Sequence, residues 1–367
     1  MSIAAVPEYL GRDFSEASPG MRFGMYLVTW KNNWEKEKNP DWSSICRIDN
    51  EHQMIASLQD RQSILIQTKN RDSVLSLPAV STAPFVTGMG NEHPQENGFA
   101  FLWPYGIPYL PGSGVKGVLR QAARELAGVS KQAQWAIESE WDQSAITALF
   151  GSEDSNDARR GTLSFWDVIP KIQEEELLVE IMTPHQSHYY QKGEQPHDSG
   201  MPTPIQFLTV PPGSGFNFHL VCDLPRLQRL APELARDGKW KALIKEAFDH
   251  AFDWLGFGAK TAVGYGAVRR MTKEEIQQQL DEENAAKLRC PWVDEVIARI
   301  VEKTNAKEDE VLRGKLLAQE WQELEDEAFK QQALKDIRAR WEKNGWWDAP
   351  PGKAAKKAKK IYEGDSS

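Results

Sequence analysis

An apolar stripe at helical spacing across residues 240–255 is the feature that most constrains the fold. Its members are Trp240, Leu243, Ile244, Ala247, Phe248, Ala251, Phe252 and Leu255. This spacing predicts a helix of about four turns with one apolar face. Such a face has to be covered by other elements, so the helix must pack onto a larger core.

Strand-like runs surround this helix in the sequence. They are residues 22–30, 63–67, 161–169, 177–182, 204–210, 215–223 and 265–271. The runs 204–210 and 215–223 flank the short turn PPGSG, which predicts that they form a β-hairpin. A second amphipathic helix is predicted from Val115, Val118, Leu119, Ala122 and Leu126. We therefore predict an α+β fold for residues 1–271.

The composition changes after Met271. Residues 272–345 are charged and helix-prone, with an apolar stripe at Trp292, Val293, Val296, Ile297 and Ile300, and they predict a C-terminal helical extension. Four tryptophans there either pack on the extension's own core or form a docking surface: Trp321, Trp341, Trp346 and Trp347. Residues 346–367 begin near a proline pair and become basic, which predicts a mobile tail able to touch an anionic partner.

Charge and cysteine content limit the classes of function. The chain has 44 basic and 53 acidic residues, a formal net charge of −9, which argues against a protein that coats nucleic acid over its whole surface. A local basic groove remains compatible with that charge. Cys46, Cys222 and Cys290 form no CxxC pair, so we expect neither a thiolate zinc site nor a disulfide framework. The first residues do not resemble a signal peptide and no long apolar run is present, so we expect a cytoplasmic protein without a membrane partner.

The first motif is PGSGVKG at residues 111–117. Gly112, Ser113 and Gly114 precede a predicted helix, and Ser113 is a candidate N-cap. Lys116, Arg120 and Arg124 are four residues apart and share one face of that helix. This face could hold a nucleic-acid backbone, or it could be a solvated basic face. The phosphate-loop pattern GxxxxGK[ST] is absent.

The second motif is GFGAKTAVGYG at residues 256–266. It places Gly256, Gly258, Gly264 and Gly266 around Lys260, after a helix and before a strand. A dinucleotide-binding fingerprint has the opposite order, strand then helix. The loop could hold phosphates against its backbone amides, or it could be a tight helix-to-strand turn.

The two motifs in this order resemble the RAMP superfamily of CRISPR effector proteins. Residues 85–125 resemble the family block around PGSGVKG, although Gly114 stands where a second serine is common, and residues 161–170 resemble a family strand that carries Asp167. Residues 179–220 are similar to a block of the RAMP subunit that lies near the guide 3′ end in type III-B (Cmr) complexes. The resemblance covers roughly residues 20–270.

The resemblance implies a ferredoxin-like (RRM-like) RAMP core with long loop insertions. It also implies a non-catalytic subunit that binds guide RNA and complementary target RNA, and that assembles with other RAMP backbone subunits and small helical subunits. We expect no cofactor and no metal. On this basis the expected RNA-binding residues are Gly112, Ser113, Gly114, Lys116, Arg120, His185, His188, Tyr189, Gly256, Gly258, Lys260, Gly264 and Gly266.

Two alternatives involve the segment 183–203. His185, His188, Tyr189, Tyr190, Lys192 and His197 would suit a metal-independent endoribonuclease that processes guide RNA precursors. The spacing of His185 and His188, with His197 or Asp198, also suits part of a zinc site, but a zinc ion needs further ligands in fixed geometry.

Overall fold

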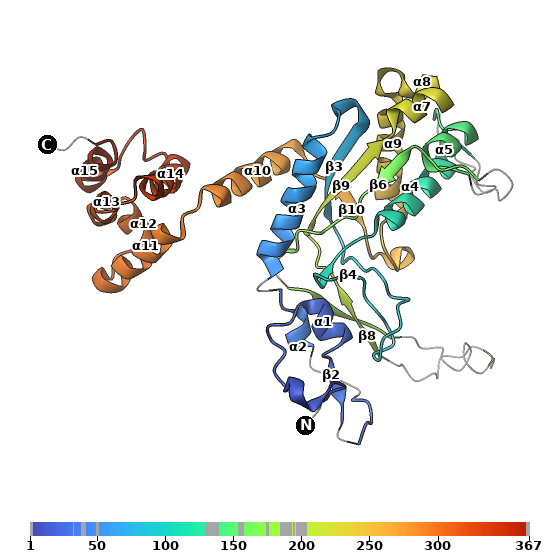
Figure 1. The fold of residues 1–367 in the computed structure, drawn as a ribbon, viewed down its shortest axis with the longest axis horizontal. Helices are drawn as coiled ribbons and strands as arrows, with labels where there is room; N and C mark the ends of the chain where they lie inside the picture. The colour runs from blue at the N-terminus through green and yellow to red at the C-terminus, as the bar shows by residue number, and fades with distance from the viewer. Residues whose placement is uncertain are drawn as a thin grey trace. The chain divides into compact units, whose positions relative to one another are not determined.

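The structure is a computed structural model that describes residues 3–31, 33–37, 42–48, 51–128, 139–152, 158–173, 176–183, 193, 195 and 204–364. The chain divides into two compact units, Met1–Met271 and Thr272–Ser367. The division falls where the composition changes. The first unit combines helices and strands, as predicted, and the described part of the second unit is helical (Figure 1).

A four-stranded antiparallel sheet organises the first unit. Its strands, in spatial order, are β10 (Val268–Arg270), β3 (Val74–Ser81), β9 (Gly215–Cys222) and β6 (Leu163–Phe165). Helix α4 (Gly112–Leu126) lies between β3 and β6 in the sequence, and α9 (Lys239–His250) lies between β9 and β10. The chain order of this core is therefore βαββαβ, with the first and third strands at the centre of the sheet.

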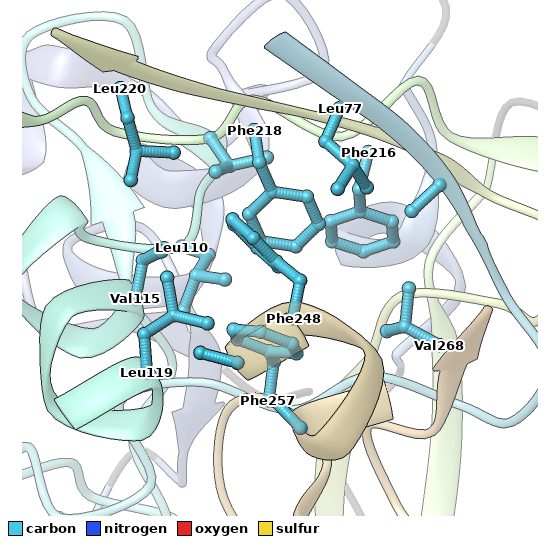
Figure 2. Packing of buried hydrophobic residues seen from close by; sticks show 14 of the residues in the cluster. Leu77, Leu110, Val115, Leu119, Phe216, Phe218, Leu220, Phe248, Phe257 and Val268 are labelled. Atoms are coloured by element: carbon cyan, nitrogen blue, oxygen red, sulfur yellow. The ribbon is translucent and has the colours of Figure 1, made fainter. Parts of the chain in front are cut away.

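One face of this sheet packs against α4 and α9. Alternate residues of β3 and β9 point to it, as the period of two in a strand requires, and they are Leu75, Leu77, Ala79, Phe216, Phe218 and Leu220. Figure 2 shows Phe218 among the aromatic rings of Phe248 and Phe257. The Phe218 ring centroid lies 5.1 Å from that of Phe248 and 4.9 Å from that of Phe257. The predicted stripe of residues 240–255 supplies the helical side of this core, ending in a π-helical turn, Ala251–Leu255.

Smaller elements complete the first unit. The two-stranded sheets are β1 (Ile3–Ala4) with β2 (Val28–Trp30), β4 (Phe101–Leu102) with β5 (Ile107–Pro108), and β7 (Leu178–Met182) with β8 (Ile205–Thr209). The further helices are α1 (Pro19–Gly24), α2 (Ser43–Cys46), α3 (Glu51–Gln67), α5 (Gln143–Phe150), α7 (Leu224–Leu230) and α8 (Pro232–Ala235).

Two predicted strands are wrong. Residues 63–67 form the last turns of α3, where Ile64 is 60% exposed, because a short apolar run fits a helix as well as a strand. Residues 22–30 divide between α1 and the short strand β2.

The predicted hairpin is also wrong. Residues 204–210 and 215–223 do form β8 and β9, but β8 pairs with β7, whereas β9 pairs with β3 and β6. The turn PPGSG therefore connects two sheets, and Ser214 is tied to β3 by a hydrogen bond from its amide to the Ser81 hydroxyl (3.1 Å). Turn chemistry predicts a tight connection but does not determine which strands pair.

The second unit contains six helices among its described residues. They are α10 (Lys273–Leu288), α11 (Pro291–Thr304), α12 (Glu308–Leu312), α13 (Lys315–Gln322), α14 (Glu327–Lys343) and α15 (Gly352–Tyr362). Trp321 and Trp341 are buried in the core of this unit, and Trp346 and Trp347 pack against it. The tryptophans thus pack on their own unit. No helix in the described parts of the chain has the length and apolar character needed to cross a bilayer.

Residues 346–364 do not form the mobile tail that we predicted for residues 346–367. Helix α15 occupies most of this segment, and Ala355, Ala358 and Tyr362 are buried in the core of the second unit. Small and aromatic residues at helical spacing anchor it. The basic composition that suggested mobility belongs to the opposite side of the helix.

Candidate nucleic-acid interface

The start of α4 is held by the strand segment that follows β6. The Gly112 amide donates to Asp167 Oδ1 (2.7 Å), and the backbones of Leu110 and Val168 pair in both directions. A Cβ atom on Gly112 would lie 2.3 Å from the Phe165 carbonyl oxygen, so this position requires glycine. The carboxylate of Asp167 thus already occupies the anion-binding position at this helix start.

Ser113 is not the N-cap that we predicted. The helix begins at Gly112, Pro111 is the N-cap, and the N-cap residue itself makes no side-chain capping hydrogen bond. Ser113 lies one position inside the helix and is exposed, and Gly114 is half-buried. The Gly114 amide donates to the Pro111 carbonyl (2.8 Å), and the helix begins two residues earlier than the serine suggested.

The basic residues of α4 have different roles. Arg120 is half-buried and donates through Nη2 to the carbonyl of Gly151 (3.1 Å), which links α4 to the end of α5. Lys116 is also half-buried, but its ammonium group makes no hydrogen bond or ion pair with a described residue. Lys116 is therefore the better candidate for a phosphate contact, and Arg120 has a structural contact that the sequence did not reveal.

Three glycines of the second motif are required by close packing. A Cβ atom on Gly258 would lie 2.2 Å from the Val86 carbonyl oxygen, and one on Gly266 would lie 1.9 Å from the Phe257 carbonyl oxygen. A Cβ atom on Gly256 would lie 3.1 Å from the Gly266 carbonyl oxygen. These residues have φ between +69° and +90°, a region that glycine adopts without strain. The base of the loop is therefore a tight turn docked on residues 84–86.

The outer part of the same loop is open. Gly258, Ala262, Val263 and Gly264 are exposed, and no atom lies within 4 Å of a Cβ built on Gly264. Most of the loop's amides donate within the protein, but those of Gly258 and of residues 260–262 donate to no acceptor among the described residues. Consecutive free amides beside a cation suit an anionic ligand such as phosphate.

Lys260 lies at the head of this outer segment. It adopts φ +62° and its ammonium nitrogen lies 3.3 Å from Met182 Sδ, at the end of β7. Tyr265 packs edge-on against Phe207 of β8, with ring centroids 5.6 Å apart. Burial raises the pKa of Tyr265, and the neighbouring Glu180 carboxylate of β7 adds to that rise. The loop therefore lies against the β7–β8 pair, which is joined by the segment that contains the predicted residues His185, His188 and Tyr189. Those three residues lie outside the described part of the chain.

Three described histidines have structural partners. His93 stacks on Phe23 with ring centroids 3.8 Å apart, and His219 Nδ1 lies 2.9 Å from the Ser76 hydroxyl. His250 Nε2 lies 2.7 Å from Glu125 Oε2. Burial lowers the pKa of both His93 and His219, which favours their neutral forms. Among the described residues, no three His, Cys, Asp or Glu side chains gather as a metal site would require.

Sequence reasoning missed two features of this region. Asp167 was noted only as part of a strand motif, whereas it binds the first amide of α4. Trp254 is 76% exposed two residues before the loop. It is absent from the apolar stripe of residues 240–255, so helical spacing alone could have placed it on the outer face.

Comparison with known proteins finds one similar curated protein and several similar solved structures. A curated protein of Pyrococcus furiosus, named CRISPR system Cmr subunit Cmr6, is 29% identical over 231 residues, and the match covers 49% of this chain. The match spans 63% of the length of that relative. A cryo-EM structure of the type III-B Cmr-beta complex bound to cognate target RNA matches with a TM-score of 0.45 and 18% identity, over 62% of this chain and 69% of that chain. The crystal structure of Cmr6 from Pyrococcus furiosus matches with a TM-score of 0.34 and 24% identity, over 56% of this chain and 100% of that chain.

The family model gives the assignment. Residues 80–269 match the model of the RAMP superfamily, which is more than half of the chain. The matched range contains α4, β6, β9, α9, both glycine motifs and almost all of β10. The chain therefore belongs to the RAMP superfamily.

Proposed function

We propose that this protein is a non-catalytic RNA-binding subunit of a cytoplasmic type III-B CRISPR-Cas (Cmr) complex. In this proposal it binds guide RNA and the guide–target duplex near the guide 3′ end, and it assembles with other RAMP subunits and small helical subunits in antiviral defence. It needs no cofactor. Membership of the RAMP superfamily and the similarity to a protein named as a Cmr subunit support the proposal.

We infer that the sheet and its two helices are a ferredoxin-like RAMP core. The support is the βαββαβ order with β3 and β9 at the centre of an antiparallel sheet. The helices cover one face of the sheet, where Phe218 packs against Phe248 and Phe257. Such a core presents loops at its edges on a rigid support, which is what a carrier of RNA requires.

The single observation that carries the proposal is the outer part of the glycine loop. It combines exposed backbone, amides without an acceptor among the described residues, and Lys260. Amides and a lysine bind phosphates without reading bases. A subunit that holds a guide needs such a grip, because base pairing between guide and target supplies the sequence specificity.

The loop does not need a reacting group for this role. Its free donors can hold a phosphate in place, but the described loop contains no histidine or carboxylate for acid–base chemistry. The endoribonuclease alternative depends on His185 and His188, which lie outside the described residues.

The experiment measures RNA affinity of the full chain over a salt series. In the variant Lys116→Gln/Lys260→Gln, we expect the slope of log affinity against log salt to become shallower by about 1.4, since each phosphate contact on a single strand contributes about 0.7. The matched control is Lys69→Gln/Lys245→Gln, which removes two exposed lysines of the same unit. An unchanged slope in the first variant, or an equal change in both, would contradict the assignment.

A second measurement tests the absence of catalysis. The purified chain is incubated with labelled repeat RNA, with and without a chelator, beside the variant His188→Ala. We expect no cleavage products. Products that disappear in His188→Ala would show that the endoribonuclease alternative is right.

A further inference from the structure

Helix α15 concentrates positive charge in a chain whose net charge is −9. Its residues, Gly352–Tyr362, include five lysines and no acidic side chain. Four of the lysines follow the spacing i, i+3, i+4 and i+7: Lys353, Lys356, Lys357 and Lys360. At about 100° per residue they fall within an arc of about 100°, and they extend over about 10 Å of helix. All four are exposed. We call this set the α15 lysine face.

The opposite side of α15 is anchored in the second unit. Ala355 and Ala358 are fully buried, and the Tyr362 ring lies edge-on to Trp321 and Trp341, with centroids 5.3 Å and 5.8 Å away. The helix is therefore held in a fixed orientation on α13 and α14, and the lysine face is presented outward. An array of charges on a fixed support loses less entropy on binding than the same charges on a mobile tail.

The fifth lysine of α15, Lys359, differs from the other four because it has partners within the protein. Lys359 is half-buried, its ammonium lies 3.4 Å from a Glu363 carboxylate oxygen, and it also lies over the Trp347 ring at 5.7 Å. The four lysines of the lysine face form no ion pair with any described carboxylate. Four neighbouring like charges repel one another, and that cost persists until a polyanion neutralises them.

We infer that the α15 lysine face is a second RNA-binding surface, one that contacts the phosphate backbone independently of the glycine loop. A polyanion with regularly spaced charges complements a stripe of four lysines. A membrane surface fits less well, because a helix that lies on a bilayer buries an exposed apolar face in it, and the apolar side of α15 is already buried in the protein. Lysine side chains act there as point charges, so binding has no base specificity.

The test compares two quadruple variants of the full chain with equal loss of charge. The first is Lys353→Gln/Lys356→Gln/Lys357→Gln/Lys360→Gln. The control is Lys303→Gln/Lys307→Gln/Lys335→Gln/Lys343→Gln, four exposed lysines of the same unit that lie on α11, on α14 and before α12. Affinity for a labelled single-stranded RNA is measured over a salt series, and circular dichroism checks that both variants remain folded.

We expect the first variant to lose at least about tenfold in affinity near 0.1 M salt and to flatten the salt slope by about 2 to 3. The control should change the slope by less than about 1. Equal slopes in the two variants, or an unchanged slope in the first, would overturn the inference. If RNA binding is unchanged but binding to vesicles of phosphatidylcholine and phosphatidylserine is lost, the surface binds a membrane instead, and the inference is also wrong.

The test of the lysine face and the test of the proposed function can fail independently of each other. Loss in the α15 variant with no effect of Lys116→Gln/Lys260→Gln would support the lysine face and contradict the loop assignment. The reverse result would contradict only the lysine face. If the α15 variant keeps its RNA slope but loses other subunits on purification, the partner is an acidic protein surface and the inference fails.

Discussion

The glycine loop at residues 256–266 and the α15 lysine face are proposed to bind the same kind of ligand, a phosphate backbone, through different donors. The loop offers backbone amides, and its base can be formed only by glycines, whose φ values are positive and whose neighbours leave no room for a Cβ atom. Helix α15 offers side-chain cations on a regular helix that is anchored by Tyr362. In the loop, the residues that build the surface also build the fold. In α15, the lysines proposed to bind RNA and the anchoring residues lie on opposite sides, so they can be changed separately.

The largest expected effect concerns the glycine loop. Replacing Gly266 with alanine places a Cβ atom 1.9 Å from the Phe257 carbonyl oxygen at a φ of +69°. We expect the unfolding free energy of the first unit to fall by about 4 kcal/mol, from backbone strain and overpacking together. Denaturant unfolding would measure this.

The control for that variant is a glycine of the first motif, Gly117. Gly117 lies inside α4, is exposed, and has no atom within 4 Å of its Cβ position. Gly117→Ala should raise stability by about 0.5 to 1 kcal/mol, because alanine restricts the unfolded chain and favours helix. Equal stability of the two variants would contradict the view that packing selects the glycines of the loop.

A smaller loss is expected for the anchor of α15. Tyr362→Ala should lower the stability of the second unit by about 3 kcal/mol, since it removes a buried aromatic ring from the contacts with Trp321 and Trp341. The transition of the first unit should not move. Tyr362→Phe is the matched control, because the Tyr362 hydroxyl is buried without a hydrogen-bond partner among the described residues. This control should be neutral or slightly stabilising. A large loss in Tyr362→Phe would show that the hydroxyl, and not the ring, anchors the helix.

The smallest expected effect is a difference between the two units in how their stability depends on pH. All seven histidines lie before Met271, and burial lowers the pKa of His93 and His219 from the usual value of 6.5. The unfolded chain then binds more protons than the folded chain just below pH 6.5. The unfolding free energy of the first unit should therefore fall by about 1 kcal/mol in all as the pH drops from 7 towards 5.

The second unit contains no histidine and should not respond in this range. Thermal unfolding followed at several pH values would show whether one transition moves and the other stays. The variant His219→Gln should reduce the pH dependence of the first transition. If both transitions move together, the two histidines are not its cause.

Local pattern predicted the elements that have long, regular periodicity. The stripe of residues 240–255 became α9 and its π-helical turn, because a buried face imposes its period on the sequence. Residues 177–182 also became a strand, β7, although none of the residues of β7 is buried. The run 63–67 was too short to separate strand from helix. The hairpin failed because the pairing of β8 with β7, and of β9 with β3, depends on residues that are distant in the sequence.

The sequence by itself determined the two-part organisation, the α+β character of the first unit and the resemblance to RAMP proteins, since these depend on composition, on spacing and on glycines in a fixed order. Only the tertiary structure decided which of the predicted donors remain available. It placed Asp167 on the first amide of α4, linked Arg120 to Gly151, and left Lys116 and the outer amides of the glycine loop without partners among the described residues. It also converted a basic tail into a helix with one anchored side and one charged side. The physical reason is that a hydrogen-bond donor can be satisfied by any acceptor that folding brings near, and that neighbour is rarely close in the sequence.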